Sequence, residues 1–93
     1  MSRGSALGFV ETRGNTGATN AIDAMMKTAN VEFAKRVETG GAYVTVMVRG
    51  EVGAVRSAVE AGAEAAGRVG ELLSTNVIPS AHDEVFELIG IAK

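Results

Sequence analysis

Two different periods of apolar residues run through this chain, and they mark out its strands and helices. Residues 6–12 alternate with the two-residue period of a strand, which puts Leu7 and Phe9 on the face opposite to Val10. Residues 16–29 change to the helical period, with apolar positions at Ala18, Ala21, Ile22, Met25 and Ala29. The first third of the chain therefore predicts a strand followed by an amphipathic helix.

The middle of the chain has the pattern of a hairpin. Val31, Phe33 and Val37 alternate with charged residues over 31–38, which is the period of a half-exposed strand. The Thr-Gly-Gly-Ala run at 39–42 interrupts this strand. Residues 43–49 then resume as a strand, with its inward positions at Val44, Val46 and Val48. Two strands joined by a short Gly-Gly turn predict a hairpin.

The last part of the chain predicts a second helix, a strand and a short terminal helix. The second helix covers 52–69, ends at Gly70 and has a lean apolar stripe of Val52, Val55, Val59, Gly62, Ala66 and Val69. Because these side chains are small, this helix must pack very close to its neighbour. Residues 71–78 read as a strand that Pro79 stops, and 82–89 read as a short helix.

The resulting order is β-α-β-β-α-β with an added terminal helix, which is the ferredoxin-like α+β arrangement. Right-handed crossovers place both long helices on one face of the sheet. With 93 residues, we expect a single domain over 1–93.

Composition indicates that this domain gains stability by association. A chain of 93 residues buries a modest share of its surface, and small domains usually compensate with disulfides, metals or partners. There is no cysteine and only one histidine, His82, so we expect neither disulfide nor metal site and no cofactor. Apolar residues make up 46% of the chain but aromatics only 4%, which suits close, flat contacts between subunits.

The charge and the termini narrow the class of partner. A net charge of −2 offers no basic field for nucleic acid or an anionic membrane. No apolar run reaches membrane-spanning length, and the N-terminus leads into no signal-peptide core. We therefore expect a cytoplasmic protein that binds neither nucleic acid nor membrane.

The glycine-rich segments carry little sign of a phosphate loop. Gly62, Gly67 and Gly70 lie inside or at the end of a helix and are expected to serve close packing or capping. The Gly-Asn-Thr-Gly run at 14–17 follows a strand and opens a helix, so we expect a turn in which Asn15 or Thr16 caps the helix. The alternative is an anion bound at the free amides of this turn.

Charged residues suggest no catalytic set. Glu60 and Glu64 lie one helical turn apart, but Arg56 and Arg68 flank them at i−4 and i+4, which predicts a solvated ladder of ion pairs. His82 lacks the nucleophile and the orienting group that a catalytic base needs. We expect no enzyme, although an enzyme of unknown type that uses His82 and a carboxylate stays open as an alternative.

Four runs in order resemble the hexameric shell proteins of bacterial microcompartments. They are ALGFVETRG from position 6, DAMMKTANV from 23, VTVMVRGEVGAV from 44 and NVIPSAH from 76. The resemblance covers nearly the whole chain, from Ala6 to about Leu88. It implies a cyclic hexamer of ferredoxin-like subunits, a flat disc that tiles with neighbouring hexamers and other shell proteins around enclosed enzymes.

The same resemblance assigns a pore and an edge. The pore falls on Gly40, Gly41 and Ala42, and small polar metabolites are expected to cross it. The edge between hexamers falls on Lys27 and Asn30, with Ser80 and His82 in the segment opposite. Family members often have Lys before a Gly-Ser-Gly pore and Arg after the proline, whereas this chain has Glu38-Thr39 before Gly-Gly-Ala and has Ser80.

A ring of such loops is largely backbone. Its outward N–H groups form a partially positive rim, so we expect selection by width and hydrogen bonding, with Arg36 and Glu38 influencing the field near the loop. The alternative function is a small-molecule-binding regulatory domain of the same fold, with residues 14–17 as its anion site and a dimer or trimer as its assembly.

Overall fold

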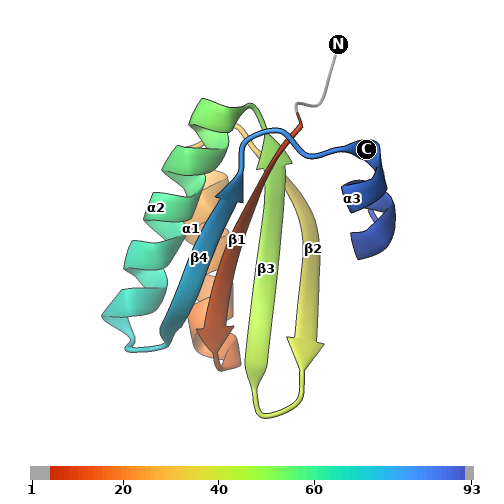
Figure 1. Cartoon of the computed structure of the whole chain (residues 1–93). Coiled ribbons are helices and arrows are strands. Elements are labelled where there is room, and N and C mark those ends of the chain that lie inside the picture. The colour runs from red at the N-terminus through yellow and green to blue at the C-terminus, as the bar shows by residue number, and fades with distance from the viewer. Residues whose placement is uncertain (1–4, 92–93) are drawn as a thin grey trace.

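A computed structural model describes residues 5–91 as one antiparallel sheet with helices on both of its faces (Figure 1). The elements follow the expected order. They are β1 (Ala6–Arg13), α1 (Asn15–Thr28), β2 (Glu32–Thr39), β3 (Tyr43–Gly50), α2 (Val52–Arg68), β4 (Leu72–Ile78) and α3 (Asp83–Ile89). Each boundary falls within about two residues of the one that the sequence pattern predicted, which is the usual uncertainty of helix and strand ends.

The sheet has the strand order β2-β3-β1-β4, so the strands of the two β-α-β units, β1-α1-β2 and β3-α2-β4, interleave. All three pairings are antiparallel, with Val10 opposite Val46 on one side and Thr75 on the other. This order confirms the ferredoxin-like arrangement. It also leaves β2 and β4 as the two edge strands of the sheet.

The main core lies between the sheet and the α1–α2 pair. The three inward valines expected on β3 are buried there, together with Val10, Met25 and Val55. Gly8 lets α2 approach β1 closely, because a Cβ at this position would lie 2.6 Å from Val59 Cγ2. Gly62 does the same between the helices, where a Cβ would lie 2.7 Å from Met25 Cγ. The close packing expected of the lean second helix is therefore confirmed.

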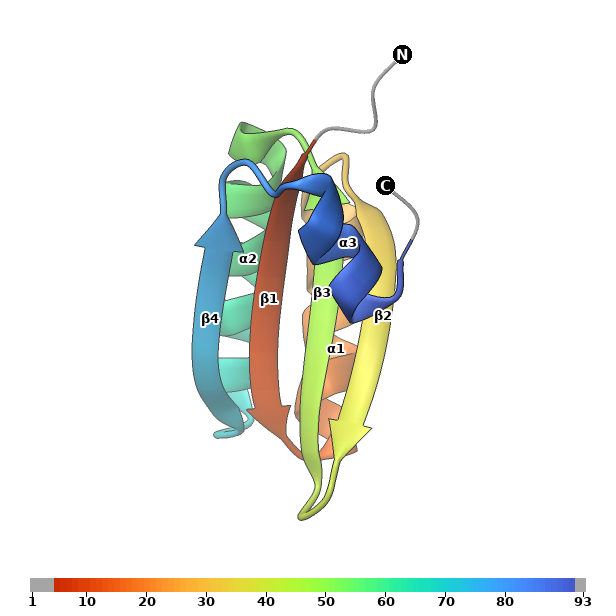
Figure 2. The same ribbon diagram turned by 45° about the vertical axis from the view of Figure 1, so that its right-hand side comes forward.

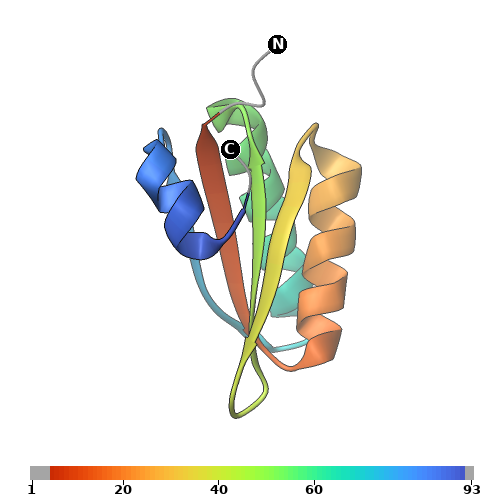
Figure 3. The same ribbon diagram turned by 90° about the vertical axis from the view of Figure 1, so that its right-hand side faces the viewer.

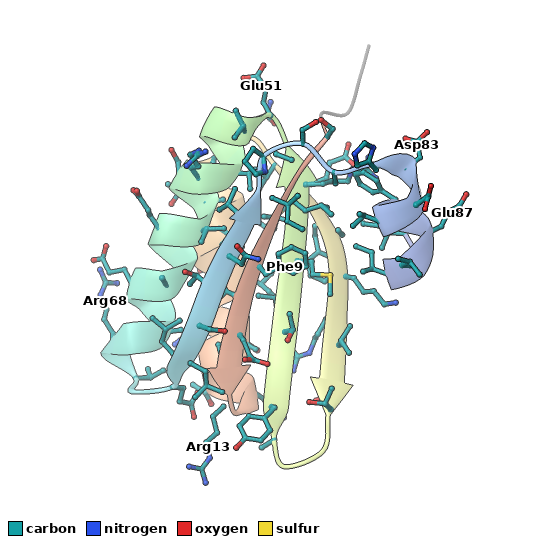
Figure 4. The ribbon with its side chains drawn as sticks, viewed as in Figure 1. Phe9, Arg13, Glu51, Arg68, Asp83 and Glu87 are labelled. Atoms are coloured by element: carbon teal, nitrogen blue, oxygen red, sulfur yellow. The ribbon has the colours of Figure 1, made fainter. Side chains whose placement is uncertain are left out.

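The short helix α3 covers part of the opposite face of the sheet (Figures 2 and 3). Its inward residue, Phe86, is buried with Leu7 and Ala81, whereas Asp83 and Glu87 point away from the sheet (Figure 4). Lys35 of β2 donates from Nζ to the carbonyl of Ile89 at 2.5 Å, at the end of α3. The two faces of β1 thus bury two separate apolar clusters, as its alternation predicted.

Strand β2 departs from the regular alternation expected for 31–38. Its register against β3 shifts between Phe33 and Lys35, because one extra residue bulges at this point. Val31 is buried before the strand begins, while Phe33 is 44% exposed. The prediction that apolar residues alternate inward through this strand is therefore wrong at Phe33.

Not every glycine of α2 has a packing role within the subunit. Gly70 has a φ of +73° directly after the helix, which confirms its place in the helix ending. Gly67 is exposed, and a Cβ there would meet no atom within 4 Å. The expectation that Gly67 serves close packing does not hold within this subunit. On the outer face of the helix, Arg68 points into solvent and pairs with Glu64 at 2.5 Å (Figure 4), one of the ion pairs that the sequence predicted.

Candidate functional site

The hairpin between β2 and β3 is the part of the fold that projects furthest at one end of the sheet (Figures 1 and 3). Thr39 pairs with Tyr43, so Gly40, Gly41 and Ala42 form the exposed tip. Gly41 and Ala42 have φ values of +76° and +65°. The tip therefore presents backbone groups and a single methyl group, as the resemblance implied.

Ala42 adopts a left-handed conformation, which is unfavourable for a residue with a side chain and costs about 1–2 kcal/mol. Its carbonyl accepts a hydrogen bond from the N–H of Gly14 at 2.6 Å. Gly14 belongs to the turn between β1 and α1, so a neighbouring loop holds the hairpin tip in this strained conformation.

Two opposite charges on β2 lie close together near the hairpin. The guanidinium of Arg36 lies 3.8 Å from the Glu38 carboxylate and donates to Asn15 Oδ1 at 2.5 Å. Both Arg36 and Glu38 lie on β2, as expected, and each offsets the field of the other. Backbone dipoles at the tip thus remain an important local source of polarity.

The start of α1 is capped by a residue that the sequence pattern missed. Gly14 is the N-cap, and neither Asn15 nor Thr16 makes the expected side-chain cap. Instead, the carboxylate of Glu71, from the loop between α2 and β4, accepts a hydrogen bond from the Gly17 N–H. A negative group at a helix N-terminus is favourable both as an acceptor and toward the helix dipole. The place where the alternative function put a bound anion is filled by the chain itself.

Two glycines make room for this carboxylate. A Cβ at Gly14 would lie 2.5 Å from Glu71 Oε2, and one at Gly17 would lie 2.6 Å from Glu71 Oε1. Gly14 also has a φ of +106°. The Gly-x-x-Gly spacing at 14–17 is the sequence signal for this close approach, although it does not say which residue approaches.

The expected edge residues near α1 are exposed. Lys27 lies in the last turn of the helix and pairs with Asp23 across one turn, with 3.0 Å between Nζ and Oδ2. Asn30 follows the helix and is also exposed. This arrangement lets Lys27 exchange an intrahelical partner for an outside one at little cost, since an exposed pair at this spacing is worth about 0.3–0.5 kcal/mol.

The segment at 79–82 carries the other two expected edge residues, and it leads to the face of the sheet that α3 covers. Ser80 and His82 are exposed, whereas Ala81 between them is buried. The Ala81 N–H donates to the carbonyl of Ser5 at 2.8 Å, which ties the segment to the start of β1. Lys27 lies on the helix of the opposite face, so the structure does not bring these two groups together within one subunit.

Residues 5–91 contain no cluster of three or more His, Cys, Asp or Glu that could hold a metal ion. Among the helices in the same range, none has the length and apolar character to cross a membrane. His82 begins α3 as its N-cap residue, without a side-chain cap hydrogen bond.

Residues 6–81 match the BMC domain profile. This span includes the hairpin tip and all four strands of the sheet. It also includes Lys27, Asn30 and Ser80, which were expected at the edge between hexamers. The chain belongs to the BMC-domain family. The BMC match ends just before His82.

Curated BMC relatives are shell proteins. The chain is 53% identical over 85 residues to carboxysome shell protein CsoS1B of Halothiobacillus neapolitanus, covering 90% of this chain and 77% of that protein. It is 50% identical over 84 residues to bacterial microcompartment shell protein PduA of Salmonella typhimurium, covering 90% and 89%. These relatives assign this chain a structural role in a shell rather than an enzymatic one, and they do not favour the regulatory alternative.

Two further relatives are longer than this chain. Probable carboxysome shell protein CsoS1E of Prochlorococcus marinus is 54% identical over 84 residues, which are 89% of this chain but 41% of that protein. A microcompartment protein from Desulfitobacterium hafniense superposes with a TM-score of 0.83 at 31% identity, covering 94% of this chain and 49% of the other. The chain thus spans 41% of the first protein and about half of the second.

Proposed function

We propose that six copies of this chain form a flat ring with a central pore, and that such rings tile into a microcompartment shell in the cytoplasm. The observation that carries the proposal is the BMC match over residues 6–81, combined with about half identity to named shell proteins. In this proposal, the shell encloses enzymes, and the pore passes their small polar metabolites. The chain itself performs no chemistry.

The sheet edges support closure into a ring. Along β2 the exposed apolar residue is Phe33, while Leu72 and Leu73 are 38% and 47% exposed along β4. These two edges differ in sequence and lie on opposite sides of the sheet. A contact between two unlike surfaces is head-to-tail, and head-to-tail contacts generate closed rings when the rotation allows it.

The hairpin tip supports the assignment of the pore. Gly40, Gly41 and Ala42 carry no polar side chain, so a ring of six tips selects by its width and by backbone hydrogen bonds. N–H groups in a turn with residues at positive φ form a concave, partially positive surface. Small polar or anionic metabolites are therefore the proposed solutes.

Contacts between rings are proposed at Lys27 and Asn30, with Ser80 and His82 facing them from the neighbouring ring. All four residues are exposed in the subunit. Other shell proteins are proposed to join the same lattice through these edges.

Sedimentation and negative-stain electron microscopy of the purified protein test the proposal together. Sedimentation is expected to show a hexamer at micromolar concentration, and micrographs are expected to show sheets or tubes built from rings. A well-folded monomer, or a dimer that binds a small anion, would contradict the ring and favour the regulatory alternative.

A further inference from the structure

Three loops lie together at the hairpin end of the sheet, and hydrogen bonds that begin at Glu71 link them in series. They are the turn from β1 to α1, the hairpin tip and the loop from α2 to β4 that carries Glu71 (Figures 1 and 3). The carbonyl of Glu71 accepts from the Arg13 N–H at 2.9 Å, and its carboxylate accepts from the Gly17 N–H. Glu71 therefore holds the turn from β1 to α1 at both of its ends.

The middle of that turn holds the hairpin. Gly14 donates its N–H to the Ala42 carbonyl at 2.6 Å. Its own carbonyl accepts a hydrogen bond from Thr12 Oγ1 at 3.2 Å, and Thr12 is fully buried. Gly14 is thus restrained on both of its backbone polar groups, and its orientation determines where the Ala42 carbonyl is held.

The space around Glu71 is specific for a carboxylate-sized group. Gly14 and Gly17 both lack the Cβ atoms that would overlap with its oxygens, at 2.5 and 2.6 Å. The same carboxylate caps the start of α1, where the N-cap residue makes no side-chain cap hydrogen bond. One carboxylate thereby serves the helix start and, through the turn, the hairpin.

We propose that Glu71 is a positioning residue for the pore. It lines no opening itself, but it fixes the turn that keeps Ala42 in its left-handed conformation and so sets the shape of the tip. This inference rests on the proposed pore function of residues 40–42. In a ring of six subunits, the same Glu71 contact would be present at every hairpin tip, so its loss would make all six tips around the pore more mobile.

Amide hydrogen exchange on the assembled protein tests this inference with a conservative pair of variants. Glu71→Ala removes the side-chain acceptor of the Gly17 N–H, while Glu71→Gln keeps a side-chain oxygen at the same distance from the backbone. Both variants keep the backbone carbonyl that accepts from Arg13. Loss of a helix cap corresponds to roughly 2- to 30-fold in a local opening equilibrium. We expect Glu71→Ala to speed exchange by about this factor in residues 14–17 and also in 39–43, and Glu71→Gln to restore most of the protection in both segments.

Two further variants separate this effect from general loss of stability. Phe86→Leu weakens α3 at the other end of the sheet, and Glu64→Ala removes an exposed carboxylate of α2 that pairs with Arg68. Neither is expected to speed exchange in 39–43 relative to the rest of the chain. The inference is overturned if Glu71→Ala affects 14–17 while 39–43 keeps its wild-type rate, or if 39–43 responds no more than in Phe86→Leu. Ring formation by the wild-type protein is a separate measurement, so failure of the proposed function would be recognised independently.

Discussion

The guanidinium carbon of Arg49 lies 4.5 Å from the centre of the Phe86 ring, so a buried cation stacks on the aromatic residue that fixes α3 to the sheet. Arg49 is 4% exposed and Phe86 is 2% exposed. A cation–π contact that is shielded from water is worth about 2 kcal/mol. This contact and the burial of Phe86 explain how a helix of seven residues stays attached to a sheet face.

Phe86→Ala is expected to lower the free energy of unfolding by about 3 kcal/mol, because it removes a buried ring and leaves the Arg49 cation without its aromatic face. Urea unfolding followed by circular dichroism measures this loss. Leu88→Ala is the matched control on the same helix. Leu88 is 84% exposed, so its truncation should change the free energy by no more than about 0.5 kcal/mol. Equal effects of the two changes would show that α3 is not held through Phe86.

Replacing the close-packed glycines Gly8 and Gly62 by alanine should have different effects on stability. Gly8→Ala directs a methyl group at Val59 and Val55, whose branched side chains are stiff in a helix, and is expected to cost about 1–3 kcal/mol. Gly62→Ala meets Met25, which adapts its shape, and it gains about 1 kcal/mol of helix propensity. Urea midpoints should therefore fall for Gly8→Ala and stay close to wild type for Gly62→Ala. The reverse order would contradict the close contacts of Gly8 with Val59 and of Gly62 with Met25.

The pore assignment can be tested with a single thiol, because the chain contains no cysteine. Gly40 is the suitable position, since a Cβ there meets no atom within 4 Å, whereas any side chain at Gly41 is strained by its φ of +76°. If six tips surround one axis, Gly40→Cys should give covalent dimers of subunits on mild oxidation. Denaturing gel electrophoresis measures these dimers.

Gly53→Cys is the control for this experiment. Gly53 is also exposed and open, but it lies at the start of α2, at the end of the sheet away from the hairpin. We expect few dimers from this variant in the assembled protein. Rings in which Gly40→Cys forms no more dimers than Gly53→Cys would place the tips away from the axis.

The edge assignment predicts that Lys27→Asp keeps the ring but abolishes sheets. A charge-assisted hydrogen bond between rings is worth about 1.5–3 kcal/mol, and a lattice repeats it at every edge. Within the subunit, the change places a second carboxylate one turn from Asp23, which costs only about 0.2–0.5 kcal/mol. Sedimentation should therefore still show rings while micrographs show no sheets.

Asp23→Asn provides the matched control, because it removes the intrahelical partner of Lys27 and leaves the lysine in place. This variant should form sheets at least as readily as wild type. Ser80→Arg adds donors to the opposite segment and should lower the protein concentration at which sheets appear. If Lys27→Asp tiles like wild type, these residues do not form the edge.

The fold was predictable because its information is local. Alternation in residues 6–12 and 43–49, helical spacing in 16–29 and the Gly-Gly break at 40–41 each act over a few residues, and together they define the order of elements. The lean stripe of the second helix likewise predicted the close approach at Gly62. These patterns reflect which residues face the core, and the spacing of apolar residues along the sequence shows this directly.

What the sequence did not reveal depends on contacts between distant segments. Glu71 caps α1 by accepting from the N–H of Gly17, which lies 54 residues earlier, a separation that no local capping pattern contains. The hydrogen bond from the Gly14 N–H to the Ala42 carbonyl joins two separate loops, and the bulge near Phe33 is defined by its pairing with β3. Local propensity favoured Asn15 or Thr16 as the cap, and a tertiary contact overrode it.

Strands β2 and β4 form the two edges of the sheet, and among residues 5–91 each pairs with a neighbouring strand on one side only. Open edges with exposed residues such as Phe33 and Leu73 are templates on which strands of other chains pair incorrectly. If the chain assembles into rings as proposed, a newly synthesised subunit is most vulnerable before it meets its partners. Rapid overproduction of this protein should favour inclusion bodies, and slower synthesis at lower temperature should favour ordered assembly.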